Sequence, residues 1–247
     1  MTVYVTGDKH GQVSSYILAN QDLRKGDIVI VCGDAGIEYG RYSEPRIKEI
    51  LKDSPANWII LRGNHDARYW DRHSVEGKFP CPGWMISRKY KNTTLVEAKY
   101  PNIHYLLDEG GIYIIGGYHF LMVPGAFSVD QDFRRMYGLP FEPREQLTEK
   151  EKEDLLQVAK NNRIDFVCGH TFPQYMKGQL KPFLMEGIKD SEVDHSMELF
   201  LNDLMLQAVL PQATFKQYFG GHFHGDQRLD SHHYLLYNEV VNVEDFC

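Results

Sequence analysis

Residues 58–66 read Trp58-Ile59-Ile60-Leu61-Arg62-Gly63-Asn64-His65-Asp66, an apolar run that ends at a glycine followed by three polar side chains. An apolar run of this kind is typical of a parallel strand that is buried on both faces. The glycine lets the backbone turn sharply. In an open α/β sheet the carboxyl ends of the strands face the ligand crevice. The stretch therefore predicts a strand whose carboxyl end places Asn64, His65 and Asp66 at the ligand crevice of the sheet.

The same arrangement, an apolar run that ends near a glycine with Asp or His, recurs elsewhere in the chain. Because the carboxyl ends of parallel strands lie at one edge of a sheet, turns far apart in sequence can converge on one point. The further turns are Gly7-Asp8-Lys9-His10 after Val3–Thr6, Gly33-Asp34 after Asp27–Val31, Gly169-His170-Thr171 after Asp165–Cys168, and Gly221-His222-Phe223-His224 after Lys216–Phe219.

Helical patterns separate the first strands, at residues 13–23 and 43–52. Alternating strands and helices predict a parallel sheet with right-handed crossovers. Residues 103–123 contain three apolar runs separated by glycine-rich turns, which predicts antiparallel strands in a second sheet. Two further helices are predicted at 145–160 and 196–210, and residues 67–101 are predicted to be irregular. The pattern places the chain in the α/β class.

The composition is that of an ordinary globular protein, with 43% hydrophobic and 25% charged residues. The formal net charge of −7 argues against a stable nucleic-acid partner, because such binding relies on Lys and Arg to neutralise phosphates. The chain has four cysteines and no CxxC pair, which favours a reducing, cytoplasmic location. No run of 18 apolar residues occurs, so no membrane span is predicted.

The side chains at the turns suit divalent metal ions. Imidazole is a good ligand for Zn, Fe and Ni, whereas carboxylate and amide oxygens suit Mn and Mg. In an extended segment the side chains of residues i and i+2 lie on the same side, so Asp8 and His10 can reach one ion, as can His222 and His224. One such pair alone is more often a surface feature, but an ordered set at five strand ends indicates a metal site.

This ordered set resembles the calcineurin-like metallophosphoesterase superfamily, and the matching motifs extend from Asp8 to His224. The resemblance implies a single domain over residues 1–247, built as a four-layer sandwich of two mixed β-sheets flanked by helices. It also implies a centre of two divalent metal ions and an enzyme that hydrolyses phosphoric esters. The first ion would be held by Asp8, His10, Asp34 and His224, and the second by Asp34, Asn64, His170 and His222.

His65 is not among the implied ligands and is the candidate to protonate the leaving oxygen or to stabilise the transition state. In the superfamily the second motif often reads Gly-Asp-x-x-Asp, and its last Asp commonly supports this histidine. Here Ile37 stands at that position. Asp66 and Glu38 are the possible substitutes, and Asp66 is therefore included with His65 among the candidate catalytic residues.

Residues 67–101 follow the central motif, so we expect them to form a substrate-binding rim beside the metals. Guanidinium groups match phosphate bidentately, although a solvated surface charge is an equally good interpretation for each arginine. The aromatic residues could equally pin a long loop to the body of the protein. The candidates are Arg62, Arg68, Arg41, Tyr69 and Trp70.

Three functions are compatible with this site. Leu61–His65 resembles the matching stretch of Ser/Thr protein phosphatases, which favours a phosphomonoesterase acting on a small molecule, a nucleotide or a phosphoprotein. The alternatives are a phosphodiesterase acting on cyclic nucleotides, dinucleotides or nucleic acid, and a catalytically silent, metal-bound scaffold. We expect Mn to be the metal, with Fe, Ni, Co or Zn as alternatives. The sequence leaves the oligomeric state open.

Overall fold

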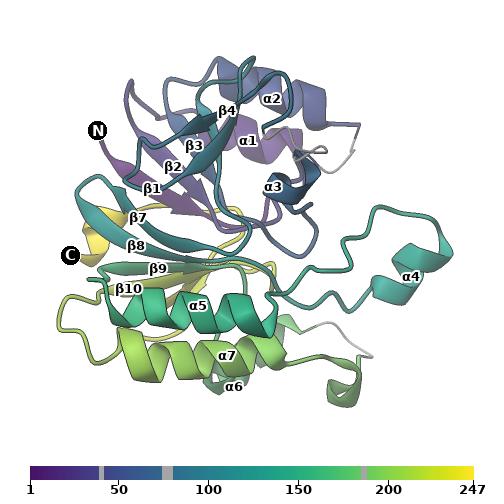
Figure 1. Ribbon diagram of the computed structural model, residues 1–247, viewed down its shortest axis with the longest axis vertical. Coiled ribbons are helices and arrows are strands. Elements are labelled where there is room, and N and C mark those ends of the chain that lie inside the picture. Colours follow the sequence, from purple (N-terminus) through teal and green to yellow (C-terminus); the bar gives the residue numbers. More distant parts are fainter. Residues whose placement is uncertain (39–41, 74–79, 185–187) are drawn as a thin grey trace.

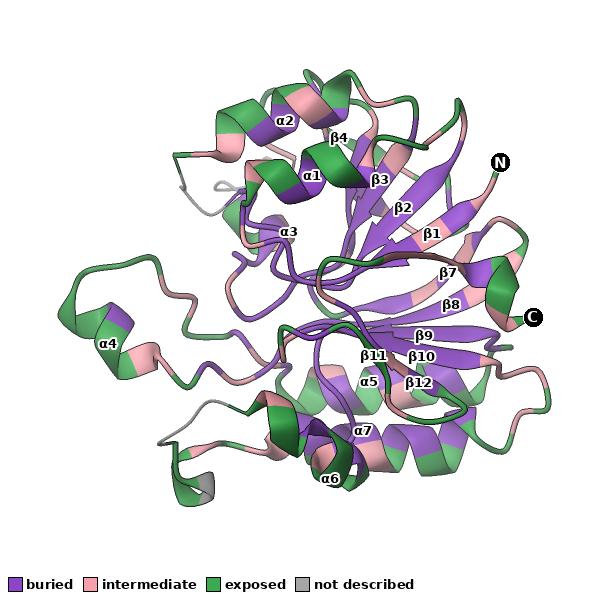
Figure 2. Ribbon diagram, turned by 180° about the vertical axis from the view of Figure 1, so that it is seen from behind, coloured by how far each residue is buried: buried purple, intermediate pink, exposed green. Residues whose placement is uncertain are grey.

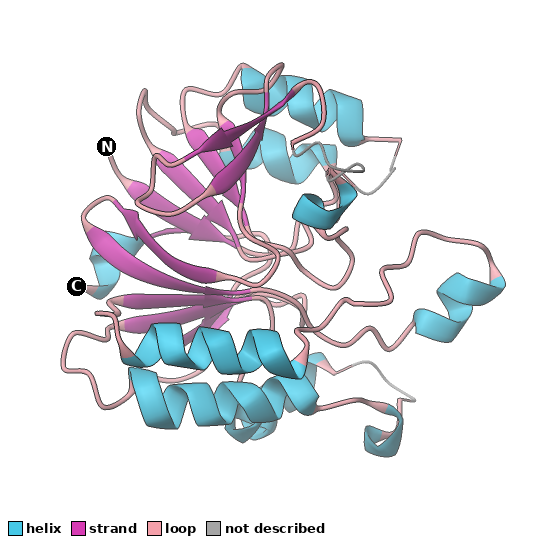
Figure 3. Ribbon diagram, viewed as in Figure 1, coloured by secondary structure: helices cyan, strands magenta, loops and turns pink. Residues whose placement is uncertain are grey.

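Two mixed β-sheets lie face to face in the computed structural model, which describes residues 1–38, 42–73, 80–184 and 188–247. Helices cover the outer face of each sheet, so the chain forms four layers (Figure 3). This arrangement confirms the predicted α/β four-layer sandwich. Both chain ends lie on the side of the sandwich opposite the loops that carry the predicted ligands (Figure 1).

The first sheet has seven strands in the order β13-β1-β2-β3-β6-β5-β4. Its centre is parallel, from β1 through β2 and β3 to β6, and both edges are antiparallel. The central strands are the apolar runs that precede the predicted ligand turns. The strands are β1 (Val3–Thr6), β2 (Ile28–Val31), β3 (Asn57–Ile60), β4 (Trp84–Ser87), β5 (Thr94–Glu97), β6 (Ile103–Tyr105) and β13 (Val240–Asn242).

The second sheet has six strands in the order β11-β12-β10-β9-β8-β7. The run from β12 through β10 and β9 to β8 is parallel, and β7 and β11 are antiparallel edges. The strands are β7 (Gly111–Ile115), β8 (Tyr118–Val123), β9 (Phe166–Gly169), β10 (Gln217–Gly220), β11 (Gln227–Arg228) and β12 (His233–Leu235).

The predicted helices form with small shifts at their ends. Helix α5 starts four residues later than predicted, because Thr148 and Glu151 form a reciprocal capping box that fixes its first turn. The helices are α1 (Val13–Ala19), α2 (Glu44–Lys52), α3 (Tyr69–Arg72), α4 (Gln131–Met136), α5 (Glu149–Lys160), α6 (Lys177–Leu180) and α7 (Ser196–Leu204). Shorter turns are η1 (Gln174–Met176), η2 (Lys181–Phe183), η3 (Asp190–Glu192), the π-helical η4 (Met205–Val209) and η5 (Val243–Phe246).

Three apolar cores separate the four layers. The central core lies between the sheets, where Val5 and Ile30 of the first sheet meet Phe166 of the second. An outer core packs the first sheet against α1 and α2, and another packs the second sheet against α5 and α7. Successive residues of β8 point into different cores, because side chains alternate along a strand. Figure 2 shows that the central strands of both sheets are largely buried.

Two strand assignments differ from the sequence-based prediction. Residues 103–105 form β6, which pairs in parallel with β3 in the first sheet rather than joining the second sheet. The segment 67–101 is only partly irregular, because it contains α3, β4 and β5, and the two strands extend the first sheet. Local patterns identify strands but not their partners, since pairing depends on contacts distant in sequence.

Residues 124–147 form a long excursion between β8 and α5, here called the arm. It carries α4 and projects from the body of the sandwich (Figure 1). The apolar side chains of Phe133, Met136 and Tyr137 on the arm are exposed. Within the described parts of the chain, no helix is long and apolar enough to cross a membrane.

Candidate metal centre

The predicted ligands sit at the carboxyl ends of strands from both sheets, in turns with an unusual backbone. His10, Asp34, His222 and His224 all have positive φ angles, between 44° and 70°. Side chains other than glycine rarely adopt this left-handed conformation, and such residues cluster at functional sites. The conformation turns the side chains toward a common point rather than along the strands.

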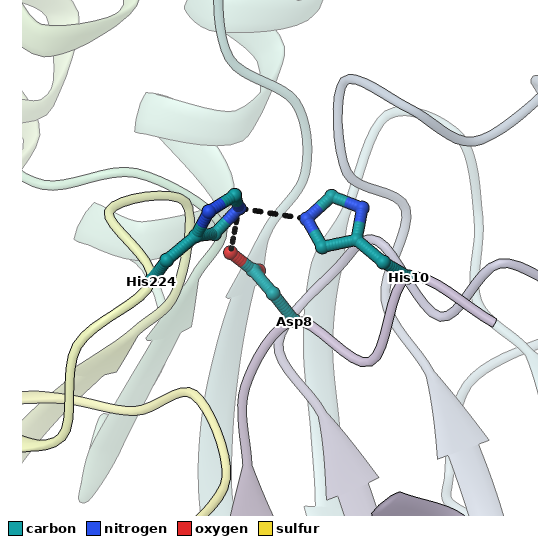
Figure 4. A group of neighbouring side chains, drawn as sticks. All are labelled: Asp8, His10 and His224. Atoms are coloured by element: carbon teal, nitrogen blue, oxygen red, sulfur yellow. Dashed lines mark hydrogen bonds and ion pairs between the residues drawn. The ribbon is translucent and has the colours of Figure 1, made fainter. Parts of the chain in front are cut away.

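Asp8, His10 and His224 form the first group of converging side chains (Figure 4). The Nε2 atoms of His10 and His224 are 2.7 Å apart, and the Nε2 atom of His224 is 3.5 Å from Oδ2 of Asp8. These three ligand atoms come from the turns after β1 and β10. Their separation is small enough for all three to bind one cation.

Asn64, His170 and His222 form a second group around the amide oxygen of Asn64. This Oδ1 atom lies 2.6 Å from Nε2 of His170 and 3.2 Å from Nδ1 of His222. The other ring nitrogen of His170, Nδ1, donates to the carbonyl oxygen of Cys32 at 2.8 Å. Metal-binding histidines usually have their second nitrogen held in this way, which fixes the ring orientation.

Asp34 lies between the two groups. Its Oδ2 atom is 3.7 Å from Nε2 of His10, and its Oδ1 atom is 3.6 Å from Nε2 of His170. Each carboxylate oxygen therefore faces one group, as expected for a bridging ligand. The structure thus brings all seven predicted ligands together at one edge of the sandwich.

The donor set fits divalent cations. Asp8 is buried, and neither of its carboxylate oxygens has a hydrogen-bond partner among the described residues. A buried polar atom without a partner is costly, so these oxygens indicate a ligand at this position. Burial, together with the nearby Asp34, raises the pKa of Asp8 well above its usual value. Burial and the adjacent His170 lower the pKa of His222 to about 3, which leaves its lone pair available for a cation at neutral pH.

Motif glycines leave the space that the ligands occupy. A Cβ atom at Gly63 would lie 2.1 Å from Oδ1 of Asp34, and one at Gly221 would lie 2.3 Å from Oδ1 of Asp8. Both distances are too short for any side chain other than hydrogen to be tolerated without displacement. The glycines therefore allow backbone from one turn to pack directly against the carboxylates of another.

The sequence model of the calcineurin-like phosphoesterase family matches residues 1–226. The chain belongs to this family. It is a metal-dependent phosphoric ester hydrolase, which confirms the superfamily and the enzyme class predicted from the strand-end motifs.

Two solved structures are similar to this phosphoesterase at 13% sequence identity. Phosphopantetheinyl hydrolase from Mycobacterium tuberculosis has a TM-score of 0.49, with 96% of this chain and 90% of that chain covered. A protein of unknown function from Aquifex aeolicus has a TM-score of 0.38, with 69% of this chain and 80% of that chain covered. No match is found among curated proteins.

His65 lies beside the predicted metal ligands of the phosphoesterase. Its backbone N–H donates to Oδ1 of Asp34 at 2.8 Å, and its ring is 5.4 Å from the ring of His10. Two residues of the arm, Asp130 and Arg134, contact its side chain. The sequence analysis missed both, because nothing in the local pattern of the arm links it to a turn more than sixty residues earlier.

The candidate supports for His65 have other partners. Asp66 accepts hydrogen bonds from the backbone N–H groups of Gly63 and Gly36, and so braces the metal-binding turns. Glu38 pairs with Lys48 and His73. These contacts are with groups other than the ring of His65, so a supporting role for Asp66 or Glu38 stays a prediction.

Arg62 and Tyr69 are buried, contrary to the expectation that they contact substrate. Arg62 is 1% exposed, and its guanidinium donates to the carbonyl oxygens of Glu145 and Asp108. Tyr69 is fully buried in the core under α1 and α2. Arg62 therefore stabilises the packing of the loops around the base of the arm and presents no group to a substrate.

Arg68 and Trp70 are anchored to the body of the protein. Arg68 is 4% exposed and pairs with Glu151, and the indole N–H of Trp70 donates to the carbonyl oxygen of Leu106 at 2.9 Å. These contacts support the alternative interpretation, in which the segment after the central motif is pinned to the sandwich. Arg41 lies outside the described residues.

Proposed function

We propose that this phosphoesterase hydrolyses phosphate monoesters with two bound divalent cations, for which Mn²⁺ is the preferred ion. One observation carries the proposal of a two-ion centre. Seven side chains with oxygen or nitrogen ligands converge, and the two oxygens of one of them, Asp34, each face a different group. Mixed imidazole, carboxylate and amide ligands favour a borderline ion such as Mn²⁺ over Mg²⁺. Fe, Ni, Co or Zn could occupy the same ligand set.

The two groups of side chains give each ion its proposed ligands. Asp34 is shared between the sites. A pair of divalent cations lowers the pKa of a bound water and stabilises charge on the phosphoryl oxygens. Asp8, His10, Asp34 and His224 would hold the first ion, and Asp34, Asn64, His170 and His222 the second.

His65 is proposed to stabilise the transition state at the leaving oxygen. It lies next to Asn64 in sequence, its backbone N–H is hydrogen-bonded to Asp34, and its side chain is partly exposed at the rim of the site. A ring N–H in this position can donate a hydrogen bond to the oxygen on which negative charge develops as the ester bond breaks.

The preference for monoesters rests on the sequence around His65. Leu61–His65 resembles the corresponding stretch of Ser/Thr protein phosphatases, and the net charge of −7 disfavours a long nucleic acid. The proposed substrate is a phosphorylated small molecule, a nucleotide or a phosphoprotein. The single-domain organisation over residues 1–247 and a cytoplasmic location remain predictions.

The proposal is tested by comparing turnover of p-nitrophenyl phosphate with that of bis-p-nitrophenyl phosphate in the presence of Mn²⁺. We expect the monoester to be the better substrate by kcat/KM. A reversed preference would identify a phosphodiesterase. Turnover of neither compound by protein that contains two metal ions per chain would favour the silent scaffold.

A further inference from the structure

The arm brings a buried arginine to the metal centre. Arg134 lies on α4, a helix that projects from the body of the sandwich (Figure 1). Its neighbours on the helix, Phe133 and Arg135, are exposed, whereas Arg134 is only 8% exposed. Arg134 is therefore the residue of α4 that turns from the exposed arm toward the protein, and the residue it meets there is His65.

The guanidinium group of Arg134 is held by the arm itself. Its Nε atom donates to Oδ2 of Asp130 at 2.8 Å, one helical turn earlier, and its Nη1 atom donates to the carbonyl oxygen of Pro140 at 2.8 Å. A planar guanidinium that is fixed at two nitrogens has its remaining nitrogen aimed in a defined direction. That nitrogen, Nη2, contacts Nδ1 of His65.

The chemistry of this contact defines how His65 is oriented. A guanidinium can only donate hydrogen bonds, so Nδ1 of His65 must accept, and the proton of the neutral ring is on Nε2. Nε2 lies 3.8 Å from Oδ1 of Asp130, a buried oxygen that has no hydrogen-bond partner in the described structure. Asp130 and Arg134 therefore contact opposite nitrogens of one ring, and together they limit its rotation.

Ile37 cannot perform this role. It is fully buried in the core under α1 and α2, and its side chain has no polar atom. We propose that Arg134 is the positioning residue for His65, and that it does so from the arm in place of a carboxylate in the second motif. This inference rests on the proposed function, because it assumes that His65 directs its Nε2–H at the leaving oxygen and stabilises the charge that develops there.

The first test measures kcat, KM and metal content for Arg134→Ala with p-nitrophenyl phosphate and Mn²⁺. We expect kcat to fall about tenfold to a hundredfold, which is less than the roughly 10²–10³-fold loss typical when such a hydrogen-bond donor is removed outright. KM and the metal content should remain near those of the wild type, since Arg134 contacts none of the seven ligands in the described bonds. A wild-type kcat in this variant would overturn the inference.

Arg135→Ala is the matched control. Arg135 is on the same helix, its side chain is 56% exposed, and its contacts in the described structure are with the arm residues Asp132, Gln131 and Phe141. Its substitution removes the same charge from the arm without touching His65, so kcat should stay unchanged. An equal loss of kcat in the two variants would show that the charge of the arm, and not the contact with His65, matters.

A double-mutant cycle separates positioning from direct phosphate binding. If Arg134 acts through His65, Arg134→Ala should have no further effect on kcat once His65 has been replaced by alanine. Additive losses, or a raised KM in both backgrounds, would mean that Arg134 binds the phosphoryl group itself and would overturn the inference.

The imidazole ¹⁵N shifts of His65 provide a readout that is independent of turnover. We expect the tautomer with the proton on Nε2 in the wild type and in Arg135→Ala, and a mixture of tautomers in Arg134→Ala. The same spectrum in all three proteins would contradict the assigned contact. If the wild type hydrolyses no phosphate ester, the proposed function fails, whereas an active wild type with an unaffected Arg134→Ala variant refutes the positioning role alone.

Discussion

The strand bodies and the strand ends of the two sheets differ in how completely their buried polar groups are hydrogen-bonded. In the bodies, residues such as Val29 and Ile30 are fully buried, apolar and paired on both sides within the first sheet. At the ends, the carboxylates of Asp8 and Asp34 are buried near each other, and the oxygens of Asp8 have no hydrogen-bond partner among the described residues. The difference shows that burial of the apolar strand bodies stabilises the fold, and that this stabilisation offsets the cost of burying carboxylates at the strand ends.

The backbone shows the same contrast. Six non-glycine residues have positive φ angles among the described residues, and four of them are predicted metal ligands. Each such residue destabilises the folded chain by about 1–3 kcal/mol when it is poorly compensated. The three apolar cores offset this strain by fixing both strands that flank a turn. Strain is therefore concentrated at the edge that carries the predicted metal ligands.

The largest expected effect is on Asp34, the predicted bridging carboxylate at the strand ends. Asp34→Asn should reduce turnover below detection and lower the metal content, because each oxygen of Asp34 faces one group of ligands. His65→Ala should lower kcat by about 10²–10⁴-fold while both metals are retained. Turnover assays and elemental analysis check the pair. Equal metal loss in the two variants would assign His65 to the ligand set.

A smaller effect is expected from adding one methyl group at a strand end. Gly221→Ala would place Cβ 2.3 Å from Oδ1 of Asp8, so that the carboxylate must move. We expect metal affinity to fall about tenfold, in the range found when the surroundings of ligands are perturbed. Gly178→Ala is the control, since nothing lies within 4 Å of that position. Metal titrations of both variants decide whether close packing at Gly221 matters.

The smallest expected effect concerns a titratable group in a strand body. Burial lowers the pKa of His104, on β6, from 6.5 to about 4, and Lys89 adds to this. The unfolded chain therefore binds a proton below pH 6.5 that the folded chain excludes until about pH 4. Stability is complete above the unfolded pKa and is lost as the pH falls, by about 2 kcal/mol between pH 7.5 and pH 5.

Urea denaturation at several pH values tests this prediction. The wild type should lose more of its free energy of unfolding between pH 7.5 and pH 5 than His104→Leu, which cannot take up a proton, by about 2 kcal/mol. Parallel curves for the two proteins would show that His104 is protonated equally in the folded and unfolded chains. His104 contacts Thr94 and Tyr90 and no predicted metal ligand in the described structure, so metal content should not differ.

Sequence patterns located the metal-binding edge because each turn is a local feature. An apolar run, a glycine and a ligand lie within about ten residues of each other at Asp8, Asp34 and His170. The same local patterns did not predict where β6 pairs or that Arg62 is buried, because both depend on residues from distant segments. Arg62 can be buried because the loop before α5 supplies the carbonyl oxygen of Glu145, which accepts a hydrogen bond from its guanidinium.

The amino-acid sequence by itself determined the family, the sandwich of two sheets and the set of candidate ligands, since hydrophobic periodicity and turn chemistry act over short distances. The tertiary structure alone decided which residues surround His65. Arg134 reaches that ring from a helix that is separated from it in the sequence by five strands, β4 to β8. No spacing rule links two such segments, because their contact depends on the path of the whole chain.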